Sequence, residues 1–94
     1  MNITLPKQNC PLCDRLVEFR GTHLGTRKKV NCPHCGIYEI STVAEQEVTK
    51  LSKQQREMLS KESMQASKNT ILSIWINLNT KEIKREYAPD ETSF

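Results

Sequence analysis

The stretch from residue 37 to residue 88 contains neither glycine nor proline, the two residue types that interrupt regular structure most strongly. All three glycines and three of the four prolines fall within the first 36 residues. This contrast predicts a turn-rich, β-type front part and a largely helical back part. No apolar run reaches about 18 residues, which excludes a membrane-spanning helix. The first nine residues lack the apolar centre of a signal peptide, and we therefore expect a cytoplasmic protein.

Sequence signatures of catalysis are missing as well. The chain has no glycine-rich phosphate loop and no spacing that pairs a nucleophile with a base. Its hydrophobic fraction of 36% lies below the ~45–50% of typical domains (a figure that counts glycine), which indicates a small core with either a solvated tail or a surface that a partner completes. We therefore expect a protein that is not an enzyme, has no small-molecule substrate and does not enter a membrane.

Four cysteines are the most informative residues that are present. They form two C-x-x-C pairs, and 18 residues separate the second cysteine from the third. This spacing is typical of a tetrahedral zinc site, and in a reducing compartment it favours metal over disulfides. We predict one structural Zn²⁺, with iron as the minor alternative because the same four-sulfur cage suits it. The predicted ligands are Cys10, Cys13, Cys32 and Cys35. Such a closed set needs no fifth ligand, so we expect His23 and His34 to be exposed.

Three short strands are expected around these pairs. Residues 16–20 alternate in polarity, residues 26–31 return after a glycine-containing turn, and residues 36–41 follow the last cysteine. Gly36 directly after that cysteine indicates a backbone position with positive φ. The pattern C-P-x-C, hairpin, C-P-x-C-G resembles a zinc ribbon with rubredoxin-type knuckles over residues 10–41. That resemblance implies a metal site and a ribbon, and it implies no single activity, because zinc ribbons occur in transcription factors, polymerase subunits, ribosomal proteins and enzyme accessory domains.

The back part is expected to be helical. Residues 42–45 and residues 52–55 both have the pattern of a capping box, which marks the start of a helix. Residues 70–78 are ambiguous: their β-branched and aromatic content favours a strand, whereas a helix would place several apolar side chains on one stripe. We favour the helix. The predicted fold is therefore α+β, with a small N-terminal zinc ribbon of three short antiparallel strands (8–41), a helical C-terminal region packed on the ribbon or on a partner (42–88), and a flexible tail (89–94).

Charge and hydrophobicity suggest two interaction surfaces. Net charge is +3 overall, with +4 in residues 1–35 and −1 in the remainder. The basic side chains beside the hairpin tip belong either to a solvated hairpin or to a nucleic-acid contact surface. They are Arg20, Arg27, Lys28 and Lys29. The densest apolar cluster is either covered by the rest of the chain or forms a protein interface. Its proposed interface residues are Ile71, Ile74, Trp75 and Leu78.

These observations favour a small zinc-binding, non-enzymatic interaction module. We expect it to act as an adaptor or regulatory component of a protein complex, with another protein or a second copy as its partner. The alternative is a nucleic-acid-binding regulator, related to transcription or RNA, that uses the basic hairpin of the ribbon.

Overall fold

A computed structural model describes residues 7–22 and 25–90 of the chain. Its centre is a six-stranded sheet in which the strands lie in sequence order. Neighbouring strands are antiparallel except β4 and β5, which are parallel. The strands are β1 (Lys7–Asn9), β2 (Leu16–Thr22), β3 (Arg27–Cys32), β4 (Gly36–Ser41), β5 (Thr70–Ile76) and β6 (Ile83–Pro89). Two helices, α1 (Thr42–Val48) and α2 (Lys53–Met64), connect β4 to β5, which is the crossover that a parallel strand pair requires.

The predicted fold of a three-stranded ribbon followed by a helical region is wrong. The strands β2, β3 and β4 lie where the sequence predicts them, but the sheet continues into β5 and β6 within the region expected to be helical. The physical reason is burial on both faces of β5, where Ile71, Leu72, Ser73 and Ile74 are all buried. A strand buried on both sides shows no alternation of polar and apolar residues.

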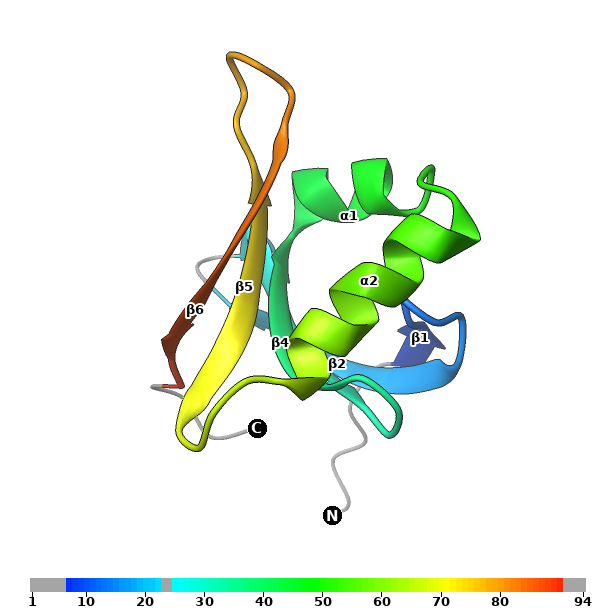
Figure 1. The fold of residues 1–94 in the computed structure, drawn as a ribbon, viewed down its shortest axis with the longest axis vertical. Coiled ribbons are helices and arrows are strands. Elements are labelled where there is room, and N and C mark those ends of the chain that lie inside the picture. Colours follow the sequence, from blue (N-terminus) through cyan, green and yellow to red (C-terminus); the bar gives the residue numbers. More distant parts are fainter. Residues whose placement is uncertain (1–6, 23–24, 91–94) are drawn as a thin grey trace.

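Both helices cover the same face of the sheet (Figure 1). Side chains of successive strand residues point to opposite faces, and the register aligns Val30, Tyr38 and Leu72 on the helix-covered face. These three side chains are buried together with Ala44 and Val48 of α1. The core of the molecule therefore lies between the sheet and the two helices.

The two helices begin at serine caps. The Ser41 hydroxyl accepts a hydrogen bond from the Ala44 N–H at 3.1 Å, so α1 is capped one residue earlier than the predicted Thr42. The capping box of Ser52 and Gln55 is confirmed, since each side chain accepts from the backbone N–H of the other at 3.2 Å. Neither helix of the described part is long and apolar enough to cross a bilayer.

The hairpin of β5 and β6 extends past the helices (Figure 1). The side chain of Asn77 closes its turn by accepting hydrogen bonds from the N–H groups of Asn79 and Thr80 at 2.9 and 3.2 Å. Lys81 follows with φ of 63°. This turn chemistry is the sequence signal that favours a hairpin over a helix here.

The face of the sheet opposite the helices contains a buried charge. The Lys29 side chain is only 1% exposed, and its Nζ lies 2.5 Å from Oδ1 of Asp90, the residue after β6. Asp90 also donates its backbone N–H to the Asn69 carbonyl at 2.8 Å. Of the predicted flexible tail (89–94), Pro89 thus belongs to β6 and Asp90 is held against β3, while residues 91–94 lie outside the described residues.

Candidate metal centre and adjoining cleft

Each cysteine pair sits in a tight turn between two strands. In the first knuckle, between β1 and β2, the Asp14 N–H donates to the Cys10 carbonyl at 2.8 Å, and Asp14 adopts a φ of 66°. In the second knuckle, between β3 and β4, the N–H groups of His34 and Cys35 donate to the sulfur of Cys32 at 3.4 and 3.3 Å. Gly36 has a φ of 84°, which confirms the backbone prediction for that position.

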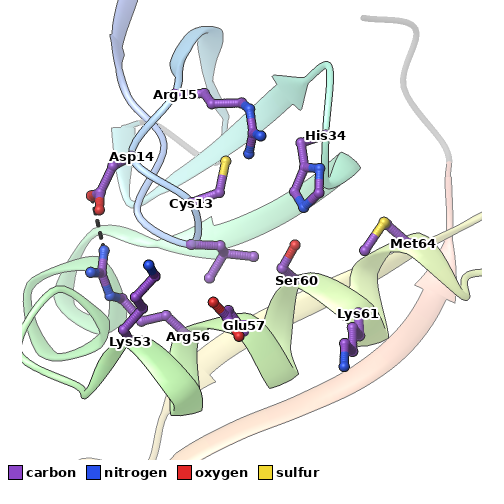
Figure 2. Close-up of a pocket in the computed structure, with 11 residues that line it drawn as sticks. Cys13, Asp14, Arg15, His34, Lys53, Arg56, Glu57, Ser60, Lys61 and Met64 are labelled. Atoms are coloured by element: carbon purple, nitrogen blue, oxygen red, sulfur yellow. Dashed lines mark hydrogen bonds and ion pairs between the residues drawn. The ribbon is translucent and has the colours of Figure 1, made fainter.

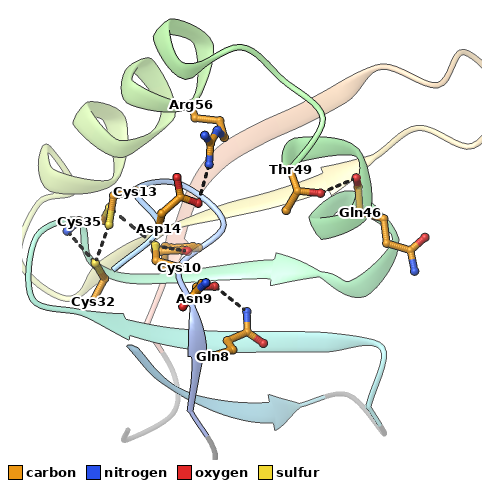
Figure 3. Close-up of polar contacts among 11 residues, drawn as sticks. Gln8, Asn9, Cys10, Cys13, Asp14, Cys32, Cys35, Gln46, Thr49 and Arg56 are labelled. Carbon is orange, nitrogen blue, oxygen red and sulfur yellow. Dashed lines mark hydrogen bonds and ion pairs between the residues drawn. The ribbon is translucent and has the colours of Figure 1, made fainter. Parts of the chain in front are cut away.

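The two knuckles bring the four cysteine sulfurs together (Figure 3), all within 4.8 Å of one another. The Sγ–Sγ distance is 4.0 Å for Cys10 and Cys35 and 3.4 Å for Cys13 and Cys32. A tetrahedron with metal–sulfur bonds of about 2.3 Å has sulfur–sulfur edges of about 3.8 Å. The cluster is therefore compatible with a bound metal ion, typically zinc.

Access to the cluster is restricted. Three of its cysteines are buried and only Cys13 is half-buried. His34 is exposed, as expected for a residue that is not needed as a ligand, whereas His23 lies outside the described residues. With four sulfurs already present, the donor set has the composition of a closed structural site.

Three hydroxyl groups surround the cysteine cluster. The Tyr38 hydroxyl lies 3.0 Å from Cys10 Sγ, and the Ser60 hydroxyl lies 3.0 Å from Cys35 Sγ. Ser63 donates its hydroxyl to the Cys35 carbonyl at 2.7 Å. Ser60 and Ser63 belong to α2, so this helix is attached to the second knuckle. The sequence analysis missed all three contacts, because isolated hydroxyl residues carry no spacing signal that links them to distant cysteines.

The cysteine thiols differ in acidity because they share protons. A hydrogen bond from the Cys35 thiol, assisted by one from Tyr38, lowers the pKa of Cys10 to about 5. That same shared proton raises the pKa of Cys35, and burial raises the pKa of Cys32. Burial also raises the pKa of Tyr38, which keeps its hydroxyl protonated and able to donate. A metal ion that binds all four sulfurs as thiolates must therefore displace protons from Cys32 and Cys35.

The basic residues predicted to contact nucleic acid mostly face carboxylates of the same chain. Arg27 pairs with Glu39 at 2.9 Å, and Lys28 pairs with Glu45 at 2.9 Å while lying 4.6 Å from the centre of the Phe19 ring. The third, Lys29, is the buried partner of Asp90. Arg20 is exposed on β2. The structure therefore does not gather these four side chains into one exposed basic surface.

The apolar residues predicted as a protein interface are also separated. Ile71 and Ile74 are buried, at 6% and 1% exposure. Trp75 is half-buried on β5, whereas Leu78 is 66% exposed in the turn of the hairpin. Because neighbouring strand residues point to opposite faces, the four side chains do not share one surface.

A cleft that the sequence did not predict lies between the knuckles and α2. Its volume is about 640 Å³. Figure 2 shows Arg15 and His34 on the knuckle side and Lys53 and Arg56 on the helix side, and Lys61 of α2 also lines the cleft. The wall also contains two carboxylates, Asp14 and Glu57, and two apolar side chains, Leu12 and Met64. Residues from three separate segments form the cleft, so no local sequence motif predicts it.

Comparison with known proteins adds no assignment. The chain matches no protein-family model, no curated protein and no solved structure. The cysteine geometry remains consistent with a zinc-ribbon-like site. The metal centre and the surface around it are therefore the features that indicate a function.

Proposed function

We propose that this chain is a non-enzymatic, zinc-stabilised interaction module that serves as an adaptor or regulatory component of a protein complex. The observation that carries this proposal is how the cysteine cluster joins separate parts of the molecule. Its sulfurs come from two knuckles, and the Ser60 hydroxyl beside Cys35 adds α2. A metal ion held there would stabilise the arrangement of sheet and helix, because metal-binding free energy becomes folding free energy.

Cys10, Cys13, Cys32 and Cys35 would hold the ion. Bound zinc supplies a charge and four strong ligand bonds to this centre. The hydroxyls of Tyr38 and Ser60, each 3.0 Å from a ligand sulfur, would orient Cys10 and Cys35 and stabilise their thiolates. The buried, four-sulfur donor set offers no open position for a substrate, which supports a structural role over a catalytic one.

We rank nucleic-acid binding by the hairpin below protein binding. Such binding depends on cations that are free to neutralise phosphates. Three of the four hairpin cations instead pair with Glu39, Glu45 and Asp90. Breaking these pairs would reduce the electrostatic gain from a nucleic acid.

Cobalt substitution tests the structural assignment of the metal. Native mass spectrometry should find one zinc per chain, lost on chelation. The Co²⁺-loaded protein should show the visible absorption of a tetrathiolate site, and added azide should leave that spectrum unchanged because no coordination position is open. A spectral change with azide would contradict a closed site and reopen the enzyme interpretation.

Affinity capture from the source cells tests the interaction role. The tagged chain should retain a stoichiometric protein partner after nuclease treatment, and Cys35→Ser should lose it. Capture of a nuclease-sensitive complex would favour the nucleic-acid alternative. A metal-loaded chain that captures no stoichiometric partner would contradict the proposal.

A further inference from the structure

We infer that the cleft between the first knuckle and α2 binds an acidic peptide segment of the partner protein. This inference rests on the proposed interaction function and assigns it a site and a ligand chemistry. The cleft residues that argue for it are Arg15, Lys53, Arg56 and Lys61, with Leu12 and Met64 beside them (Figure 2).

The cleft has an excess of positive charge that the chain itself does not neutralise. Four lining cations face two carboxylates, Asp14 and Glu57. The ion pair within the cleft joins Arg56 Nη1 to Asp14 Oδ1 at 2.9 Å. In the part of the chain that the structure describes, Arg15, Lys53 and Lys61 have no ion-pair partner. This distribution differs from the hairpin, where each of three cations pairs with a carboxylate.

Arg56 adds a mostly buried cation that Asp14 holds in place. Its side chain is 17% exposed and its Nε is buried, with no hydrogen-bond acceptor among the described residues. Arg56 donates a hydrogen bond to the Asp14 carboxylate, and this contact raises the pKa of Arg56, so the guanidinium stays charged. Because Nε is buried and Nη1 already contacts Asp14, an incoming carboxylate would meet the remaining exposed part of this guanidinium as a charge-assisted donor. A carboxylate that enters the cleft would find this group ordered by Asp14 before it arrives.

The mixed character of the walls favours a peptide over a nucleic acid. Asp14 and Glu57 would repel an unbroken row of phosphates, whereas a peptide can place its carboxylates away from them. Among the residues that the structure describes, the lining has no tyrosine, tryptophan or phenylalanine on which bases would stack. It does offer Met64, 47% exposed, whose flexible side chain adapts to apolar groups. An acidic segment with an apolar side chain between its carboxylates fits this composition.

The metal centre holds both walls of the cleft. On one wall, Leu12 and Cys13 belong to the first knuckle. On the other, Ser60 of α2 contacts Cys35 of the second knuckle. The relative position of the cationic groups therefore depends on the cysteine cluster, and peptide binding is expected to require the metal-loaded protein.

The test uses the full zinc-loaded chain and a labelled decapeptide that alternates glutamate and leucine. Nuclear magnetic resonance shifts should map binding to the knuckle and α2 residues of the cleft, and a glutamine–leucine peptide should not bind. The double variant Arg15→Gln, Lys53→Gln should weaken binding by about tenfold, since each removes a charge-assisted contact. Lys68→Gln, which changes an exposed lysine outside the cleft, should leave the affinity within about twofold.

Three results would overturn the inference. One is a single-stranded DNA decamer that binds the cleft while the glutamate peptide does not. A second is peptide binding that the double variant leaves unchanged. The third is a folded, loaded chain that binds neither probe. Affinity capture from source cells distinguishes failure of this inference from failure of the proposed function. A partner that wild type and double variant retain equally would reject the cleft as the binding site. A wild-type chain that retains no partner would reject the interaction role itself.

Discussion

Tyr38 connects the metal centre to the core of the sheet. Its side chain is fully buried between Val30 and Leu72 in the register, and its hydroxyl ends 3.0 Å from Cys10 Sγ. Tyr38 follows the basic hairpin in the sequence, where an exposed ring could stack on a base. Burial excludes it from stacking on an incoming base, and the structure assigns its hydroxyl to the cysteine cluster.

The variant Tyr38→Phe should bind zinc about tenfold more weakly, because it removes a hydrogen bond that stabilises a ligand thiolate. Competition with a chromophoric chelator measures this affinity. The matched control is Tyr87→Phe, which removes a hydroxyl that donates to the Glu62 carbonyl at 2.8 Å and not to a cysteine sulfur. Equal zinc affinities for the two variants would show that the Tyr38 hydroxyl does not support the site.

Zinc affinity should rise steeply with pH. Cys10, with a pKa of about 5, is already a thiolate at pH 6. Cys32 and Cys35, with pKa values raised above the ordinary 9.0, remain protonated and must each lose a proton when the ion binds. The logarithm of the apparent binding constant should therefore increase by about two or more per pH unit between about pH 6 and 8. Titration against a chelator of known pH dependence measures this slope, and a flat profile would contradict the proton count.

Among the elements, the strands β2, β3 and β4 were predictable, whereas β1, β5 and β6 were not. Alternating burial marks β2 and β4, whereas β3 was indicated by the glycine-containing turn before it, because its neighbours Lys29 and Val30 are both buried. The apolar run of β5 lacks that alternation because it is buried on both sides. The β-branched and aromatic content of residues 70–78 favoured the strand that forms, and the helix that we preferred is wrong. The cleft was beyond prediction from sequence, since it depends on how α2 packs against the knuckles.

The capping box at the start of α2 allows a test of how much the Ser52 cap contributes to stability. Replacing Ser52 with alanine removes the acceptor for the Gln55 N–H, and we expect a loss of about 1 kcal/mol in the free energy of unfolding. Urea denaturation of the zinc-loaded protein measures the change. Gln54→Ala, at an exposed position of the same helix, should stay within about 0.5 kcal/mol of wild type. A cap variant as stable as this control would mean that packing alone sets the start of α2.

For the molecule as a whole, one ion pair joins the two halves of the sheet. Lys29 in β3 is buried and Asp90 follows β6, so the contact spans three strand boundaries. Asp90→Asn should lower the free energy of unfolding by about 1–3 kcal/mol, because it removes a negative charge beside a desolvated ammonium group. Thermal and urea unfolding both report this loss.

The exposed pair of Lys50 and Glu47 is the natural comparison. Its side chains are 71% and 45% exposed. Glu47→Gln should therefore change stability by less than about 0.5 kcal/mol, as is usual for surface pairs. Similar losses for Asp90→Asn and Glu47→Gln would show that burial does not strengthen the Lys29 contact.

The parallel pairing of β4 with β5 also means that, during synthesis, β4 is made well before the strand that pairs with it. Ile40 of β4 is paired with Ile74 of β5, which is synthesised 34 residues later. At a translation rate of ~5–20 residues per second, the edge of β4 that pairs with β5 stays unpaired for roughly two to seven seconds until β5 has been synthesised. The cysteines, all within the first 35 residues, are complete before that wait begins. A nascent chain that loads its metal early would still expose the edge of β4 during this interval, and an exposed strand edge can pair with another chain.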